Sequence, residues 1–397
     1  MQILYLSGMA SEAAIKDARQ RDPGFSNYAP QKFNRLVAEG FVRNGHKVTA
    51  LSTFYLPGIG HGYRRQRETE KGVTYQYIFS LNYRPIRYVW LIVYCFIRVL
   101  LFGLFRKKEK VLVANILNIS ACMGAVAAAR LIGLRRVAVM TDMPGLMVDN
   151  SNSSENKALS NRASFIAKMN KSFLAHFTHY VFLTKKMNEM INIHHRPYIV
   201  MEGLVDADMS LPAAIEKNAK RVVLYAGSLH ERYGLKLLVE GFLQANIKDS
   251  ELWIYGGGPF GQKLKEYNEL DSRVVYKGIC PNTEVVAAEL RATLLVNPRP
   301  THEEFTQYSF PSKNVEYMVS GTPLLTTMLP GMPAEYYPHV FLFDQGETVE
   351  GYAKVLQQVL CMPDDDLKEK GLEARNWVLN NKNHQKQTER IVELINR

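Results

Sequence analysis

Strand-like and helix-like segments alternate twice along this sequence, and the alternation restricts the fold more than any other feature. Residues 1–200 alternate apolar runs such as "QILYLS" and "KVTALS" with helical patterns, and residues 220–345 repeat the alternation from "RVVLYAG" to "TPLLTT". Strands and helices that take turns form parallel sheets covered by helices on both faces. We therefore predict an α/β protein with two doubly wound, Rossmann-like domains that face a cleft, with one ligand held by each domain.

The length of the chain also indicates two domains. At 397 residues and 45.2 kDa it exceeds what one hydrophobic core usually supports. A polar segment that contains proline, residues 198–220, separates the two series, so we predict an N-terminal domain at 1–203 and a C-terminal domain at 204–382. The last helix, 383–397, could pack back on the first domain. The start, "MQILYLSGM", lacks a basic region and is too short for a signal peptide, so we expect a first strand there.

The charge is distributed unevenly between the two halves. Residues 1–200 contain 28 Lys and Arg against 11 Asp and Glu, a balance of +17, whereas the whole chain carries +11. A basic half indicates an anionic partner. Its basic residues are scattered and no recognised nucleic-acid motif is present, so we expect a membrane surface and no nucleic acid. The four cysteines show no metal or disulfide spacing, as in a cytosolic protein.

The segment Tyr88–Phe105 is apolar except for Arg98, and basic residues lie on both sides of it. A membrane-spanning helix needs about 20 apolar residues, and a central arginine costs about 3 kcal/mol, so a span is not expected. Two readings stay open: a buried domain helix, or a helix that lies in the head groups of anionic lipid, where each Lys or Arg adds about 1 kcal/mol. We predict a cytoplasmic protein, peripheral on the inner face of the membrane.

The stretch "EEFTQYSFPSKNVEYMVSGTPLLTT" predicts a phosphate-binding helix. The helix opens on Ser312 and Lys313, where free N–H groups and a cation converge. Glu316, one turn later, could accept hydrogen bonds from a ribose diol. Arg299, in "VNPRP", follows a strand end and could grip phosphate through two hydrogen bonds.

Two glycine-containing turns follow predicted strands of the second half. Gly227 and Ser228 lie in "YAGSLHERYG", and Gly257 and Gly258 lie in "YGGGPFG". Neither segment fits GxxxxGK[ST] or GxGxxG. The glycines either allow a ligand to approach the backbone or simply form tight turns.

The order and spacing of "GSLHERYGLKLLVEGF", "WIYGGGPF", "VVYKGI" and "FPSKNVEYMVSGTPLLTT" resemble the C-terminal half of the GT-B glycosyltransferases of family four, also called group 1. The resemblance covers most of residues 220–345. It implies a nucleotide-sugar donor on the second domain, an acceptor on the first, and neither a metal nor another cofactor. The glutamate with which the family contacts the donor ribose falls on Glu316.

Two departures from the family pattern concern charge. The family has an acid eight residues before the ribose-binding glutamate, where this chain has Tyr308, and we favour the nearby Glu304 in its place. The Arg and Lys that follow the family's first C-domain strand fall on Ser228 and Tyr233. We hypothesise that Arg299 and Lys313 supply the lost charge from the opposite side of the diphosphate.

In the first half, Asp142 follows the strand "VAVMT" and could act as a base on an acceptor hydroxyl, orient that hydroxyl, or cap a helix. The loop "SGMASEAA" is the other predicted acceptor wall. We do not expect either of two acidic motifs to bind a metal ion. Asp206 to Asp208 fits the DxD pattern but lies in the linker, and Asp364 to Asp366 is expected to cap a helix. We predict no metal.

These observations predict a glycosyltransferase that moves a sugar from a nucleoside diphosphate to a hydroxyl of a lipid-linked glycan, in the assembly of a capsule or exopolysaccharide. An epimerase or glycan phosphorylase of the same fold is the first alternative. A basic nucleic-acid-binding protein is the second.

Overall fold

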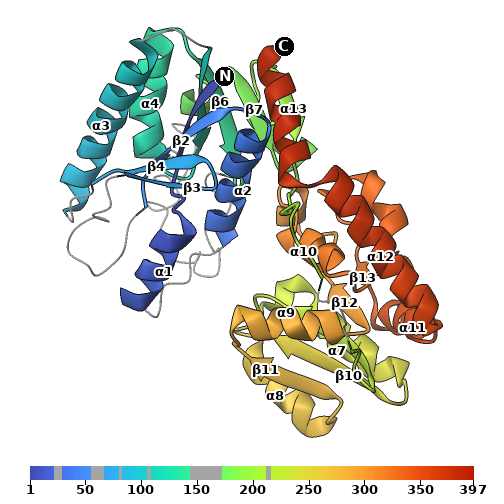
Figure 1. Cartoon of the computed structure of the whole chain (residues 1–397). Helices are drawn as coiled ribbons and strands as arrows, with labels where there is room; N and C mark the ends of the chain where they lie inside the picture. The colour runs from blue at the N-terminus through green and yellow to red at the C-terminus, as the bar shows by residue number, and fades with distance from the viewer. Residues whose placement is uncertain (22–28, 55–66, 80–82, 105–108, 144–171, 212–215) are drawn as a thin grey trace, which may run out of the picture. The chain divides into compact units, whose positions relative to one another are not determined.

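The chain forms two compact units (Figure 1). The computed structural model describes residues 1–21, 29–54, 67–79, 83–104, 109–143, 172–211 and 216–397. The first unit contains Met1–Leu204 together with His384–Arg397, and the second contains Val205–Asn383. The division after Leu204 lies one residue beyond the boundary predicted from the sequence.

The described residues of the first unit form an eight-stranded sheet in the order β3-β4-β2-β1-β5-β6-β7-β8. Every neighbouring pair is parallel except the β3-β4 hairpin. The central strands are almost completely buried, as expected where helices cover both faces. The strands are β1 (Gln2–Ser7), β2 (Lys47–Ser52), β3 (Arg67–Glu70), β4 (Val73–Tyr77), β5 (Lys110–Asn115), β6 (Arg135–Met140), β7 (His179–Phe182) and β8 (Tyr198–Val200).

The helices of the first unit cover this sheet. Residue Asn118 caps α4 by accepting a hydrogen bond from the Ala121 amide, and Gly45 ends the turn after α2 with a φ of +79°. The sequence pattern also predicts a helix near 158–176, a segment that lies mostly outside the described residues. The described helices are α1 (Glu12–Arg21), α2 (Ala29–Arg43), α3 (Arg84–Leu104), α4 (Ile119–Leu131), α6 (Lys185–Ile191) and α13 (His384–Asn396).

The C-terminal helix α13 is part of the first unit. Its side chains Ile391, Leu394 and Ile395 are buried in that unit's hydrophobic core. The Asn44 side-chain amide, just after α2, donates to the Gln385 carbonyl oxygen at 2.9 Å. The close approach of α13 to α2 requires Gly40, because a Cβ there would lie 2.2 Å from the His384 carbonyl oxygen.

The described residues of the second unit form a six-stranded, fully parallel sheet in the order β11-β10-β9-β12-β13-β14. On β9, Val223 and Tyr225 enter one apolar cluster and Val222 and Leu224 enter another, so the sheet has a core on each face. The α/β fold class with parallel sheets is confirmed. The strands are β9 (Arg221–Ala226), β10 (Ser250–Tyr255), β11 (Val274–Gly278), β12 (Leu294–Asn297), β13 (Leu324–Thr326) and β14 (Phe341–Leu342).

The helices of the second unit follow its strands in turn. Pro311 precedes α10 and Gly321 ends it with a φ of +76°, so proline starts the helix and glycine stops it. The elements are η2 (Glu231–Tyr233), α7 (Leu235–Ala245), α8 (Gly261–Leu270), α9 (Asn282–Arg291), η3 (Glu304–Gln307), α10 (Ser312–Ser320), η4 (Ala334–His339), α11 (Val349–Leu360) and α12 (Asp364–Asn381).

The packing of α13 on α2 is testable at Gly40. We expect Gly40→Val to lower the free energy of unfolding by about 1–3 kcal/mol, because the added atoms must push the two helices apart. Arg43→Ala, at an exposed position of the same helix, is the control and should change stability by less than about 0.5 kcal/mol. Equal effects in urea unfolding would contradict the packing role of Gly40.

Candidate functional site

The residues predicted to bind a phosphorylated ligand follow the carboxyl ends of strands in the second sheet. Because β9 lies between β10 and β12, the loops after these three strands are neighbours at one edge of the sheet. The helix α10 follows β12 through the segment that contains η3. The predicted residues are Gly227 and Ser228 after β9, Gly257 and Gly258 after β10, Arg299 after β12, Glu304 on η3, and Ser312, Lys313 and Glu316 on α10.

Backbone packing explains the glycines after β10. The Gly227 amide donates to the Tyr255 carbonyl oxygen and the Leu229 amide donates to the Gly257 carbonyl oxygen, each at 3.0 Å. Gly258 has a φ of +153°, and a Cβ there would lie 2.5 Å from the Leu229 carbonyl oxygen. At least Gly258 is therefore required for the contact between two loops, whether or not a ligand approaches it.

Helix α10 is fixed to the sheet by hydrogen bonds from buried side chains. The Tyr317 hydroxyl accepts from the Ala226 amide at 2.9 Å and donates to the Ala226 carbonyl oxygen at 3.1 Å, at the end of β9. The side-chain amide of Asn297, at the end of β12, donates to the Asn314 side-chain oxygen at 2.6 Å. These bonds set the position of the α10 first turn, where Ser312 is exposed and Pro311 provides no side-chain cap.

Arg299 is a partly buried cation without a carboxylate. Its guanidinium carbon lies 4.9 Å from the centre of the Tyr233 ring and 5.9 Å from that of Phe305. Burial lowers the pKa of Arg299. In the described part of the chain, its side chain makes no hydrogen bond or ion pair. A desolvated charge with no counter-ion is unfavourable, so this arrangement is one that an anion would stabilise.

A second arginine shares the same two rings and was missed by the sequence reasoning. The Arg232 guanidinium carbon lies 5.5 Å from the Tyr233 ring centre and 5.3 Å from that of Phe305. The two rings pack edge to face, with centres 5.7 Å apart. Arg232 directly precedes Tyr233, where the family has lysine, and this adjacency was the signal that could have revealed it.

Lys313 is compensated by two carboxylates. Its Nζ lies 3.3 Å from Glu316 Oε2 and 3.5 Å from Oε1 of the buried Glu289. Burial acts to lower the pKa of Lys313, but the charges of Glu316 and Glu289 outweigh it and the pKa is raised. Lys313 and Glu316 thus lie side by side as predicted, while most of the positive charge that Lys313 brings is already balanced within the protein.

The remaining predicted acid of this unit is Glu304. It opens η3 and is exposed, whereas Tyr308, at the position where the family has an acid, is buried. Because Tyr308 is buried, it is not placed to replace the acid that the family has at this position. Glu304 therefore remains the candidate for the residue that contacts the sugar.

Asp142, in the first unit, is half-buried two residues after β6. Burial raises the pKa of its carboxyl group. Among the described residues its carboxylate makes no hydrogen bond or ion pair. The segment that follows, from 144, is outside the described residues.

The loop after β1, which is the other predicted acceptor wall, makes hydrogen bonds to side chains of its own unit. The Ala10 amide donates to the Gln31 side-chain oxygen at 2.7 Å, and the Ser11 hydroxyl donates to Glu68. Tyr77 also donates to Glu68, at 2.5 Å. These contacts hold the loop against α2 and the β3-β4 hairpin.

The acidic motifs have local explanations. The Asp208 amide donates to Asp206 Oδ1 at 3.0 Å, which forms a turn in the linker. Residues Asp364 to Asp366 occupy the first turn of α12, but Pro363 is its N-cap, so the prediction that these acids cap the helix is corrected: they act on its dipole, and Asp364 pairs with Arg221 at 2.9 Å. In the described ranges no cluster of three or more His, Cys, Asp or Glu residues could hold a metal ion.

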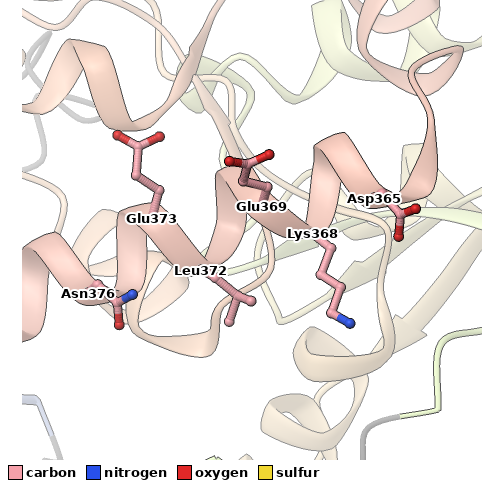
Figure 2. Close-up of a pocket in the computed structure, with 6 residues that line it drawn as sticks. All are labelled: Asp365, Lys368, Glu369, Leu372, Glu373 and Asn376. Carbon is pink, nitrogen blue, oxygen red and sulfur yellow. The ribbon is translucent and has the colours of Figure 1, made fainter.

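A surface hollow on α12 does not coincide with this site. Figure 2 shows that its lining comes from successive turns of a single helix, and none of the predicted residues takes part. The lining residues are Asp365, Lys368, Glu369, Leu372, Glu373 and Asn376.

Comparison with known proteins relates this geometry to a family. Residues 220–361 match the family described as glycosyl transferases group 1. Among solved structures, sucrose-phosphate synthase from Thermosynechococcus elongatus superposes with a TM-score of 0.63 at 14% identity, over 100% of this chain and 98% of that chain. No curated protein matches the sequence.

Two further solved structures are similar over their whole lengths. Alr3699/HepE from Anabaena, in complex with UDP and glucose, has a TM-score of 0.58 at 12% identity and coverage of 100% and 99%. WaaG, a glycosyltransferase involved in lipopolysaccharide biosynthesis, has a TM-score of 0.58 at 14% identity and coverage of 99% of each chain.

The fold and the matched region together define the class: the chain is a glycosyltransferase with the GT-B fold. The match to the glycosyl transferases group 1 covers residues 220–361, which carry the predicted donor-binding residues.

The pairing of Lys313 with Glu289 predicts a measurable coupling. We expect Lys313→Met to destabilise the fold by on the order of 2 kcal/mol, because it leaves the buried Glu289 without this counter-ion, and the half-exposed lysine reduces the effect below that of a fully buried pair. Adding Glu289→Gln should restore most of the loss. The free energies of unfolding of the wild type, the two single variants and the double variant give the coupling; additive effects would show that the pair is not stabilising.

The raised pKa of Asp142 predicts a pH-dependent gain in stability on its removal. A carboxyl group whose folded pKa lies above its unfolded value destabilises the fold when ionised, so the cost is present at neutral pH and vanishes as both states become protonated. We expect Asp142→Asn to melt at a higher temperature than the wild type near pH 7, and the difference to disappear below about pH 4. A variant that melts lower at pH 7 would contradict the burial argument.

Proposed function

We propose that this glycosyltransferase moves a sugar from a nucleoside diphosphate donor to a hydroxyl group of a lipid-linked glycan, in the assembly of a surface polysaccharide such as a capsule or exopolysaccharide. The donor binds the second unit at the edge where β9, β10 and β12 end. The acceptor binds the first unit near Asp142. The enzyme works in the cytoplasm, at the inner face of the membrane.

The observation that carries the donor assignment is the uncompensated charge of Arg299. Its guanidinium stacks on Tyr233 and lacks a carboxylate in the described residues, so the fold tolerates a charge that a diphosphate would neutralise. Planar guanidinium groups bind phosphate oxygens through paired hydrogen bonds. The HepE structure, solved with UDP and glucose, supports a nucleotide sugar as the ligand of this chain.

The chemistry that we propose is electrostatic. Negative charge develops on the diphosphate as its bond to the sugar breaks, and donors fixed in advance stabilise it without reorganisation. Arg299, together with the uncapped first turn of α10 at Ser312, supplies this stabilisation. Lys313 contributes less than the sequence predicted because Glu289 and Glu316 share its charge. No metal is required in this scheme.

The carboxylates have separate roles in the proposal. Glu316 accepts hydrogen bonds from the donor ribose, and Glu304 contacts the sugar. Asp142 acts on the acceptor hydroxyl, either as a base or by orienting it. Its raised pKa suits a base, because a carboxylate with a higher pKa binds a proton more readily. A base is needed if the reaction inverts the anomeric centre, whereas orientation suffices if it retains it.

Two observations support a lipid-linked acceptor, which is the more specific part of the proposal. WaaG acts in lipopolysaccharide biosynthesis, and its likeness to this chain over 99% of both lengths supports an acceptor of the same kind. The excess positive charge of residues 1–200 supports work near an anionic lipid surface.

The test is a thermal-shift titration with UDP, GDP and nucleotide sugars, with chelator present. We expect Arg299→Ala to weaken binding of the diphosphate nucleotide at least about ten-fold, as the loss of a charge-assisted hydrogen-bond pair implies. Because Arg299 is an uncompensated charge, the unliganded variant should melt no lower than the wild type.

Arg291→Ala is the matched control, since it removes an exposed arginine of the same unit. A variant Arg299→Ala that melts lower and binds nucleotide normally would show a structural role and refute the site. If no nucleotide raises the melting temperature of the wild type, the donor assignment fails.

A further inference from the structure

Helix α3 carries two rows of apolar side chains on opposite sides. One row is buried and repeats every four residues: Leu91, Cys95, Val99 and Gly103. It packs on α4, where Gly124 allows the backbones to approach, since a Cβ at Gly124 would lie 1.9 Å from the Ile92 carbonyl oxygen. Figure 1 shows α3 and α4 side by side. One side of α3 is thus fully used by the fold of the first unit.

The opposite row is exposed and is called here the outer row of α3. Each of its six side chains is between 46% and 62% exposed, and the three- or four-residue spacing places them on one helix face. Soluble monomers rarely expose a continuous apolar patch of this length, and such patches mark a binding surface. The outer row consists of Ile86, Val89, Val93, Ile97, Leu101 and Leu104.

The arrangement is not that of a membrane span, although α3 is long and apolar enough to cross a bilayer by length and composition. A single isolated span would face lipid on all sides, whereas the row of Leu91, Cys95 and Val99 already contacts protein. Arg98 lies between the rows, and its guanidinium donates to the Gln76 side-chain oxygen on β4. The helix therefore presents only one face to any partner.

The charges around α3 select the partner. From Arg84 to Lys108, α3 and the four residues that follow it in the sequence contain six Lys and Arg and no Asp or Glu. A second copy of the chain would bring the same positive charges together across a symmetric interface, which is unfavourable. An anionic lipid surface instead offers apolar volume to the outer row and negative head groups to the basic residues.

The amino-terminal end of α3 supports the same partner. Tyr83 and Tyr88 are 65% and 47% exposed, and the Arg87 guanidinium lies 5.5 Å from the Tyr88 ring centre. Tyrosine and arginine, with an apolar body and a polar end, favour the boundary between head groups and acyl chains.

We propose that the outer row of α3 docks the enzyme on an anionic lipid bilayer. The helix axis then lies parallel to the membrane plane, and the side of α3 that packs on α4 faces away from the lipid. This inference deepens the proposed function, because it places the unit that binds the acceptor at the surface in which a lipid-linked acceptor is anchored.

The test is sedimentation of the full-length protein with vesicles of phosphatidylcholine alone and of phosphatidylcholine with phosphatidylglycerol, without nucleotide or acceptor. The wild type should sediment with the anionic vesicles, and less so as salt is raised. Val93→Gln combined with Ile97→Gln should lower the partition coefficient at least ten-fold. The matched control, Leu270→Gln with Leu372→Gln, removes two exposed leucines of the second unit and should bind as the wild type does.

Three results would overturn the inference. The first is a wild type that binds no anionic vesicles at low salt. The second is a stable dimer by light scattering that the Val93→Gln, Ile97→Gln variant dissociates while vesicle binding persists, which would assign the row to a second copy. The third is a lower melting temperature of that variant with unchanged vesicle binding, which would mean that the chain itself covers the row.

Titration of the same variant with UDP separates this inference from the proposed function. Vesicle binding that is lost while UDP binding is kept supports docking by α3. Normal vesicle binding by α3 in a protein that binds no nucleotide would refute the donor assignment and leave the docking surface intact.

Discussion

The hydrogen bonds of Tyr317 with the end of β9 are the constraint on which the candidate site depends. One buried hydroxyl satisfies both the amide and the carbonyl of Ala226, and Asn314, three residues earlier, binds Asn297 at the end of β12. Buried polar groups of this kind are costly to leave unpaired, so they fix a helix in one position. Everything placed by α10, including Lys313 and Glu316, inherits that position.

Charge balance then separates residues that look alike in the sequence. Lys313 and Arg299 are both cations after β12, but Lys313 lies within 3.5 Å of two carboxylates while Arg299 stacks on aromatic rings. A cation that the fold already neutralises contributes to stability, whereas a cation left without a carboxylate has its charge available to a ligand. The two apolar rows of α3 differ in a similar way: one row packs on α4, and the other is exposed.

The periodicity of the sequence predicted the elements of the second unit well because each strand and helix there follows a local pattern. Its helical pattern predicts helices at 312–319 and 260–270, and the structure has α10 at Ser312–Ser320 and α8 at Gly261–Leu270. The pairing of Lys313 with Glu289 could not be predicted, since the two residues meet through the packing of α9 against α10 and are 24 positions apart. The contact of Arg232 with the Phe305 ring likewise depends on how separate loops pack, and so does the requirement for Gly258, which the contact with Leu229 explains.

The last helix gives the chain an unusual order of assembly. Ile391, Leu394 and Ile395 are part of the core of the first unit, so this core lacks three of its apolar side chains until these residues have been synthesised. The unit from Val205 to Asn383 has every residue it needs sooner. Although domains generally fold in the order in which they are synthesised, here the later unit has all of its residues first, and the core of the first unit can close only after α13 has been made.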